Sequence, residues 1–273
     1  MIDPIPLRLR FKAMYAELVV LATLPVYLGA VGLYGLKVLA VLALSVCTGI
    51  VFDVMARRLG DAVYTRSTWP IWFVVPLAFP PGAPLWLVPL AVGFALLFGC
   101  LLFGGYGRSL FPVAAMAIVF LSLGYPAEVN ILTKPFADHL AGFSTYASQV
   151  PVSNTVFSDL NRFADVSPKA FFHGLMPGNI GESYAGLLIG IGLLFLLVGI
   201  LDPRFVFSAV STTVILSFYG HTAYPQQVLS PVFQMLAGGF LVYLVFFVSS
   251  DPFALPRTPE GRWIGGFLFG LFT

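Results

Sequence analysis

The sequence predicts an all-α, polytopic membrane protein, from its composition and from a series of long apolar runs. Hydrophobic residues make up 59% of the 273 residues, and charged residues only 10%. A soluble domain carries about a quarter charged residues, so this chain could not cover a surface that faces water. Phenylalanine alone occurs 27 times, which suits a surface that faces lipid. The composition therefore excludes a soluble globular domain.

The apolar runs approach the length that a bilayer requires. A helix needs about 20 apolar residues to cross the hydrocarbon core. We predict spans over residues 15–34, 38–55, 67–80, 84–103, 111–125, 183–200, 204–220, 229–248 and 262–273. The last run is short for a full crossing, so it is either a half-helix or the start of a longer segment. These runs make residues 1–273 a single transmembrane domain with about nine to ten helices.

Lysine and arginine are distributed unevenly between the two sides of these spans. Cytoplasmic loops of membrane proteins carry an excess of both residues. The side that holds the N-terminus has ten of them: Arg8, Arg10, Lys12, Arg57, Arg58, Arg66, Arg108, Arg204, Arg257 and Arg262. The other side has four: Lys37, Lys134, Arg162 and Lys169. The bias predicts a cytoplasmic N-terminus, and it places the long connection 126–181 on the outer, periplasmic face.

Two glycine-rich breaks interrupt the apolar pattern, and both read G-x-x-G-charge-S. Residues 104–109 form the first break on the inner side, and residues 178–183 form the second on the outer side. Paired breaks of this kind are typical of inverted repeats in which half-helix N-termini point into the protein. Such N-termini offer free N–H groups to an anion or to the polar edge of a ring. Coincidence is the alternative, because glycine accounts for 27 residues of the chain.

Four charged residues near the ends of spans are candidate functional groups. Glu182 could cap the following helix, where the helix dipole favours a carboxylate, or it could contact a cofactor or a neighbouring subunit. Asp53 and Asp251 lie at inner ends of spans, where an ionisable side chain is either functional or an interfacial charge among headgroups. Arg108 could pair with a phosphate or serve as an inner-side anchor.

Several other classes of site lack support in the sequence. Cys47 and Cys100 are far apart, and no pair of histidines has metal-ligand spacing on one helix. There is no phosphate-binding loop, no G-x-G-x-x-G after a strand and no basic helix. The sequence therefore predicts neither a metal site nor nucleic-acid binding.

The second glycine break and the C-terminal region resemble one family. Residues 178–183, G-N-I-G-E-S, followed by the run L-L-I-G at 187–190, are similar to the G-S-I-G-E-T-S…L-L-I-G signature of the Rnf D subunit and of its relative in sodium-translocating NADH:quinone reductase, the NqrB protein. Residues 250–262 resemble the T-D-P…P-x-T-P-x-G-R of the same proteins. Gly60-Asp61 and the Gly104–Gly107 stretch match two weaker motifs in the same order.

The resemblance implies a fold, a cofactor and a set of partners. Members have a urea-transporter-like helical bundle with inverted repeats. They carry FMN on a threonine in an outer loop through a phosphoester, and some also hold riboflavin. They relay electrons between flavins inside a multisubunit complex of the bacterial inner membrane that moves Na⁺ or H⁺. Other membrane and peripheral subunits would be the partners here, as would the lipid bilayer.

The flavin attachment site is the part of the resemblance that this chain matches least well. The family motif is [ST]-G-A-T, some tens of residues before G-S-I-G-E. The equivalent place here reads Val152-Ser153-Asn154-Thr155, so Thr155 is the expected FMN site, with Ser153, Asn154, Glu182 and Arg108 as the other candidate flavin contacts. Thr145 is a second candidate. Members also run on past the 250–262 motif, which implies either a compact variant or a further C-terminal part.

Two functions from different classes follow. The first is a flavoprotein subunit that relays electrons with coupled ion movement. The second is a flavin-free transporter, channel or assembly scaffold that keeps the fold, and the altered attachment motif favours it. A plain urea-type channel is a weaker third, because the family motifs point elsewhere.

Overall fold

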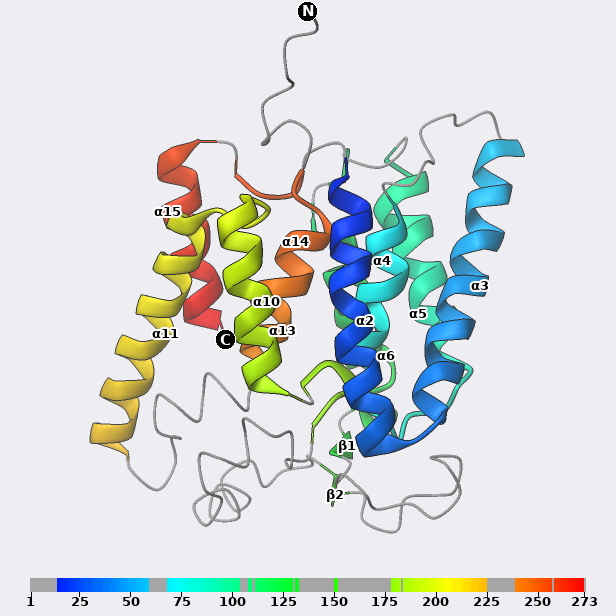
Figure 1. Ribbon diagram of the computed structural model, residues 1–273, viewed down its shortest axis with the longest axis horizontal. Coiled ribbons are helices and arrows are strands. Elements are labelled where there is room, and N and C mark those ends of the chain that lie inside the picture. The colour runs from blue at the N-terminus through cyan, green and yellow to red at the C-terminus, as the bar shows by residue number, and fades with distance from the viewer. Residues whose placement is uncertain are drawn as a thin grey trace, which may run out of the picture.

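The computed structural model describes most of the chain as a bundle of helices that run roughly alongside one another (Figure 1). The described residues are 14–58, 68–103, 108–109, 111–129, 131–132, 150–151, 178–182, 184–224, 239–256 and 258–272. In this part the only strands are β1 (Ile131–Leu132) and β2 (Val150–Pro151), which form one short antiparallel pair. The fold class predicted from the sequence, an all-helical membrane protein, is confirmed at this level.

The first group of helices occupies the N-terminal half of the chain. Its members are α2 (Tyr15–Tyr34), α3 (Lys37–Arg58), α4 (Trp69–Val74), α5 (Leu87–Leu96), α6 (Val113–Gly124) and the single turn α7 (Pro126–Val129). A 3-10 turn extends α4 over Val75–Ala78, and a π turn extends α5 over Leu97–Leu101. Gly35 ends α2 with a φ of 84°, which a residue without Cβ adopts at low cost.

The second group follows the long connection. It consists of α10 (Ala185–Val198), α11 (Pro203–Ala223), the continuous stretch α13 (Phe240–Val242), π turn (Tyr243–Phe247) and α14 (Val248–Ser250), and finally α15 (Pro259–Phe272). A 3-10 turn, Ile180–Glu182, precedes α10. Asp202 caps α11 by accepting a hydrogen bond from the Arg204 N–H, and Pro203 occupies the first helical position, where a missing N–H costs nothing.

Each predicted span has a helix at its place among the described residues. The first matches its prediction at both ends, and α15 begins three residues before the predicted start at Arg262. The predicted span 229–248 corresponds to the helical stretch that ends at α14. This stretch is described from Phe240 onward, because residues 225–238 lie outside the described part. In that part, three helices are long and apolar enough to cross a membrane: Tyr15–Tyr34, Lys37–Arg58 and Pro203–Ala223.

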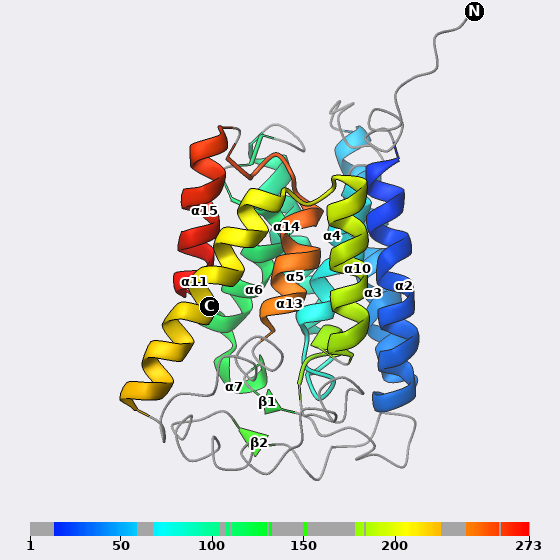
Figure 2. The same ribbon diagram turned by 60° about the vertical axis from the view of Figure 1, so that its left-hand side comes forward.

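The bundle has two distinct ends. The five arginines of the described residues, Arg57, Arg58, Arg108, Arg204 and Arg262, belong to segments that meet at the end where α3 and α10 finish and α4, α11 and α15 begin; we call this the arginine end (Figure 1). The strands β1 and β2 lie at the opposite end, which we call the strand end (Figures 1 and 2). This segregation matches the uneven charge distribution found in the sequence.

The broken helix α4 lies in the core, where side chains of neighbouring helices donate hydrogen bonds to its carbonyl groups. The hydroxyl of Tyr27 on α2 donates to the carbonyl of Phe73 at 2.6 Å, and that of Ser45 on α3 donates to the carbonyl of Trp72 at 2.5 Å. A Cβ at Gly49 would collide with the Trp72 ring, so the glycine lets α3 approach α4. Irregular backbone at membrane depth is stable only when protein groups satisfy it in this way.

The helices α11 and α15 form the closest pair in the second half. A Cβ at Gly266 would meet the carbonyl oxygen of Phe205, and one at Gly270 would meet that of Ala209. The Ser208 hydroxyl donates to the Trp263 carbonyl at 2.7 Å across the same interface. Small residues that let two backbones approach are the usual basis of helix association in lipid.

Candidate functional site

The second glycine break folds against the end of the broken helix α4. The Ile180 N–H donates to the carbonyl of Phe79 at 3.0 Å, directly after the 3-10 turn that ends α4. A Cβ at Gly181 would lie 2.8 Å from the Leu77 Cβ and 2.9 Å from the Leu77 carbonyl oxygen. Only glycine fits this approach, so the fourth residue of the G-x-x-G pattern is explained by packing.

Glu182 closes this turn from within. Its carboxylate accepts hydrogen bonds from the Asn179 backbone N–H at 3.1 Å and from the Asn179 side-chain amide at 2.9 Å. The residue is partly buried, and burial raises the pKa of its carboxyl, while the two bonds from Asn179 oppose that rise. One carboxylate oxygen also lies against Gly239, where α13 begins. Both oxygens thus have partners, and Asn179 lies three residues away along the chain.

The predicted capping role of Glu182 is wrong. The N-cap of α10 is Tyr184, and no side chain caps this helix. Glu182 instead stabilises the turn that precedes the helix, because its carboxylate is held by Asn179.

Asp251 is the corresponding carboxyl group at the arginine end. It follows α14, is 1% exposed and accepts a hydrogen bond from the Ser109 hydroxyl at 3.0 Å. Burial raises the pKa of the Asp251 carboxyl, and this rise is opposed by the Ser109 hydroxyl and by the nearby backbone N–H groups of Val113, Phe253 and Ala254.

The donors to Asp251 leave one of its oxygens without a partner. Among the described residues, no hydrogen bond reaches Asp251 Oδ1, and the buried Tyr15 hydroxyl, which is electrostatically coupled to Asp251, also has none. A buried polar atom without a partner is rare in native structures, and bound water, an ion or a functional role are among its explanations. This group is therefore able to accept a proton or to contact a cation.

The sequence left two interpretations open for Asp53 and Asp251, a functional group or a charge exposed among the headgroups. Neither side chain is exposed, so the second interpretation does not hold. Asp53 is 8% exposed and forms an ion pair with Arg57, one helical turn away, at 2.5 Å. Because Arg57 is itself largely exposed, this pair has the character of a surface ion pair, which contributes little to stability. Asp53 Oδ1, like Asp251 Oδ1, has no hydrogen-bond partner among the described residues. Asp251 differs in having no such cation among them.

Of the candidate flavin contacts, the described residues include only Arg108 and Glu182, and these two lie apart. Arg108 is exposed next to Ser109 at the arginine end, whereas Glu182 lies where α13 begins. Residues 240–250 separate the two levels, which corresponds to about 16 Å at 1.5 Å per residue. Arg108 and Glu182 therefore do not fit one flavin head. Thr155, Ser153 and Asn154, like Thr145, lie outside the described residues.

Sequence reasoning missed the neighbours of Asp251. Tyr15 and Ser109 are distant from it in sequence, and only the fold brings Ser109 into hydrogen-bond contact and Tyr15 within electrostatic range of Asp251. The presence of Ser109 in the first glycine break was the one available signal. No group of three or more metal-ligating side chains occurs among the described residues.

Comparison with known proteins identifies the relatives of this chain. The sequence profile of the NQR2, RnfD, RnfE family matches residues 11–273. The chain is 25% identical to the D subunit of the ion-translocating oxidoreductase complex of Aeromonas hydrophila, over 94% of this chain and 82% of that protein. It is also 25% identical to the protein of the same name in Rhodobacter capsulatus, over 92% and 78%. The B subunit of the Na(+)-translocating NADH-quinone reductase of Yersinia pestis is 30% identical over 81% of this chain and 54% of its own length.

Proposed function

Because the chain belongs to the NQR2, RnfD, RnfE family, we propose that it is a membrane subunit of an ion-translocating electron transport complex of the Rnf type. Its relatives are subunits of ion-translocating oxidoreductases, which supports a role in electron transport and ion translocation together with other subunits. The observation that carries the proposal beyond the family is the buried carboxyl group of Asp251, with an oxygen that has no partner in the described part of the chain.

In this proposal, Asp251 is where the translocated ion, Na⁺ or H⁺, engages the subunit. An ionisable side chain within a membrane domain is costly and therefore rare, and it often marks an ion path. Burial favours the protonated acid at Asp251, and a nearby cation would favour the carboxylate. The group can therefore exchange a proton for a cation. Tyr15 would supply a neutral oxygen from α2 beside it.

The proposed fold is a urea-transporter-like bundle of nine to ten transmembrane helices with inverted repeats, and internal likenesses between the two halves support it. A Y-A-x-L sequence stands at the start of both α2, where Tyr15 is the first residue, and α10, where Tyr184 is the N-cap, and the two helices start at opposite ends of the bundle (Figure 1). The buried broken helix α4 and the stretch α13–α14 also run in opposite directions. Phe79 follows the first and Asp251 the second, and both begin an x-P-x-x-x-P segment.

Further pairings agree with this assignment. Helix α3 packs on α5, as α11 packs on α15. Under the proposed symmetry, Asp251 takes the place that Phe79 has in the first half. One half would then present a backbone carbonyl at this position, and the other an ionisable side chain.

The cofactor of the proposed complex subunit is FMN attached to Thr155 in the outer loop. The flavin would supply the redox chemistry, while the chain holds and orients it. Thr155 lies at the distance before the 178–183 motif that the family resemblance implies. Glu182 packs in the turn of that motif, so it would stabilise the turn in which the outer loop ends.

The attachment is tested by ultraviolet fluorescence of the chain on a denaturing gel, after co-expression with a flavin transferase. A fluorescent band that is lost in Thr155→Ala and kept in Thr145→Ala supports FMN on Thr155. The reverse pattern would move the site to Thr145. Extraction of the purified complex, followed by chromatography, then separates bound riboflavin from attached FMN.

The second candidate is a flavin-free transporter, channel or assembly scaffold of the same fold. The altered context of Thr155, where Ser and Asn stand in place of Gly and Ala, favours it. So does the separation of Arg108 from Glu182. Absence of a fluorescent band in the unchanged chain, in cells whose transferase labels a related subunit, would favour this candidate.

We place the chain in the bacterial inner membrane with its N-terminus in the cytoplasm. The gathering of all five described arginines at one end supports this orientation. The test is labelling of single cysteines from outside intact cells, in a background that lacks Cys47 and Cys100. Thr155→Cys should react and Arg257→Cys should not; reaction of both from one side would overturn the topology.

A further inference from the structure

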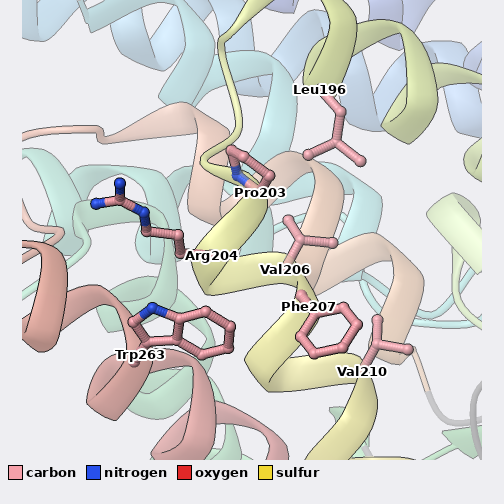
Figure 3. A pocket seen from close by; sticks show the side chains of 7 residues that line it. All are labelled: Leu196, Pro203, Arg204, Val206, Phe207, Val210 and Trp263. Carbon is pink, nitrogen blue, oxygen red and sulfur yellow. The ribbon is translucent and has the colours of Figure 1, made fainter.

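A groove of about 530 Å³ opens on the surface of the second half, beside the closely packed pair α11 and α15. Its walls come from three helices. Those from α10 and α15 are Leu196 and Trp263, and those from α11 are Pro203, Arg204, Val206, Phe207 and Val210 (Figure 3). Every lining side chain except Arg204 is apolar or aromatic.

The groove exists because of two local features of the chain. Gly199, with a φ of 82°, ends α10 and allows a sharp connection into Pro203. Helix α11 therefore diverges from α10 just below that connection. On the other side, the Ser208 hydroxyl holds the Trp263 carbonyl, and Trp263 packs edge-on against Phe207 with ring centroids 5.9 Å apart. The aromatic wall is thus fixed to α11.

The charge at the edge of the groove is positive and not neutralised. Asp202 does not pair with the Arg204 guanidinium, because its two carboxylate oxygens accept hydrogen bonds from the Arg204 backbone N–H and from the Arg262 guanidinium. The side chain of Arg204 is exposed and has no acidic partner among the described residues. Glu260 lies in the first turn of α15 but does not line the groove. Figure 3 shows the Arg204 side chain pointing away from the apolar lining side chains, on the same side of the groove as Trp263.

The surroundings of the groove are those of a surface that faces lipid. Phe207 is 65% exposed and Trp263 is 45% exposed, and α10 also carries the exposed side chains of Leu193, Leu194 and Leu197. Tryptophan and arginine together at the end of apolar helices mark the level of the headgroups. The ligand that fits is an amphiphile with an apolar chain and an anionic head.

From this geometry we propose that the groove binds one anionic phospholipid. An acyl chain lies along Val206, Phe207 and Val210, and the phosphodiester binds the guanidinium of Arg204 beside Trp263. Basic positions between helices at a membrane surface bind anionic headgroups in this way, and one arginine contributes about fivefold in affinity, the equivalent of about 1 kcal/mol. The lipid would fill the gap between α10 and α11 at the arginine end.

Native mass spectrometry of the detergent-purified chain tests the proposal, with dioleoylphosphatidylglycerol as the anionic probe and dioleoylphosphatidylcholine as its zwitterionic match. We expect one phosphatidylglycerol to be retained more strongly than phosphatidylcholine. Arg204→Gln should weaken its binding about fivefold. The control is Arg58→Gln, which removes an exposed charge at the same end of the bundle away from the groove and should leave binding unchanged.

Two further arms separate the parts of the ligand. Val210→Trp fills the groove and should reduce retention of phosphatidylglycerol while Arg204 is intact. Glycerol phosphate, which has the head but no chain, should not compete. Circular dichroism and a monodisperse elution profile verify that each variant is folded, and Arg204→Gln, at an exposed position, is the arm that does not depend on repacking.

Several results would overturn the proposal. Equal binding of the two lipids would remove the role of the anionic head, and equal losses in Arg58→Gln and Arg204→Gln would reduce it to general charge. Competition by glycerol phosphate would indicate a phosphate site instead of a lipid site. A Val210→Cys label that reacts in the isolated chain but is covered by another subunit in the complex would assign the groove to a protein partner.

Discussion

The two ends of the bundle each contain a carboxyl group beside the end of a broken helix, yet the two groups are held in different ways. At the strand end, Glu182 has both oxygens engaged by Asn179, three residues away. At the arginine end, Asp251 takes a hydrogen bond from Ser109, 142 residues away, and keeps a buried oxygen free of partners in the described part. The carboxylate of Glu182, whose two oxygens both have partners, stabilises a turn, whereas Asp251 has a buried oxygen that no described residue binds. We therefore assign a structural role to Glu182 and propose that Asp251 binds the translocated ion.

The strongest test of this difference is Asp251→Asn. The amide cannot bind a cation through charge or release a proton, so ion-coupled electron transfer by the assembled complex should fall about tenfold or more, the effect of losing roughly 1.4 kcal/mol of binding free energy. The measurement is the rate with and without added Na⁺, across a range of pH. Glu182→Gln is the matched control and should retain most of the coupled rate. Equal losses of the coupled rate in both variants would contradict the different roles of Asp251 and Glu182.

The next largest effect concerns the packing of the strand-end turn. Gly181→Ala places a Cβ against Leu77, including its backbone oxygen, so we expect a destabilisation of about 1–3 kcal/mol from overpacking. Gly190→Ala is the control, because a Cβ at Gly190 has nothing within 4 Å. The melting temperature in detergent should fall for Gly181→Ala only. A turn that tolerates the alanine would show that Ile180–Glu182 is not seated on α4 as described.

A smaller effect is expected from Ser109→Ala, which removes one donor to Asp251. The Ser109 bond lowers the pKa of the Asp251 carboxyl, so its loss raises that pKa further. The limb of the pH–rate profile that reports ionisation should move to higher pH, with a stability loss of about 1 kcal/mol. Ser211→Ala, whose hydroxyl bonds only within α11, serves as the control. An unshifted profile would contradict the role of Asp251 in the rate.

The smallest effect is the dependence of stability on pH at Glu182. Because the folded-state pKa of its carboxyl is raised above the ordinary value, its contribution to stability is present below that ordinary value. The contribution is lost as the pH rises through the raised pKa. Glu182→Gln mimics the protonated acid, so it should flatten this part of the curve of melting temperature against pH, by about 1 kcal/mol of unfolding free energy. An identical slope in both proteins would contradict burial of the carboxyl.

The amino-acid sequence alone was sufficient to predict the helical membrane class, the positions of the spans and the family. Apolar runs and charge bias are local properties, and a span such as 15–34 is set by the length of its own run because a bilayer accepts little else. The two G-x-x-G breaks were recognised from the sequence as interruptions of the apolar pattern, but the residues that they contact were not.

Which residues meet depended on the folded chain. The pairing of Ile180 with Phe79, of Ser109 with Asp251, and of α11 with α15 joins segments that lie tens to hundreds of residues apart. Packing selects these contacts by shape and by the need to satisfy buried polar groups, and no local pattern encodes them. For the same reason, the sequence could not decide between the two roles that it left open for Glu182, and it could not show that Arg108 lies far from Glu182.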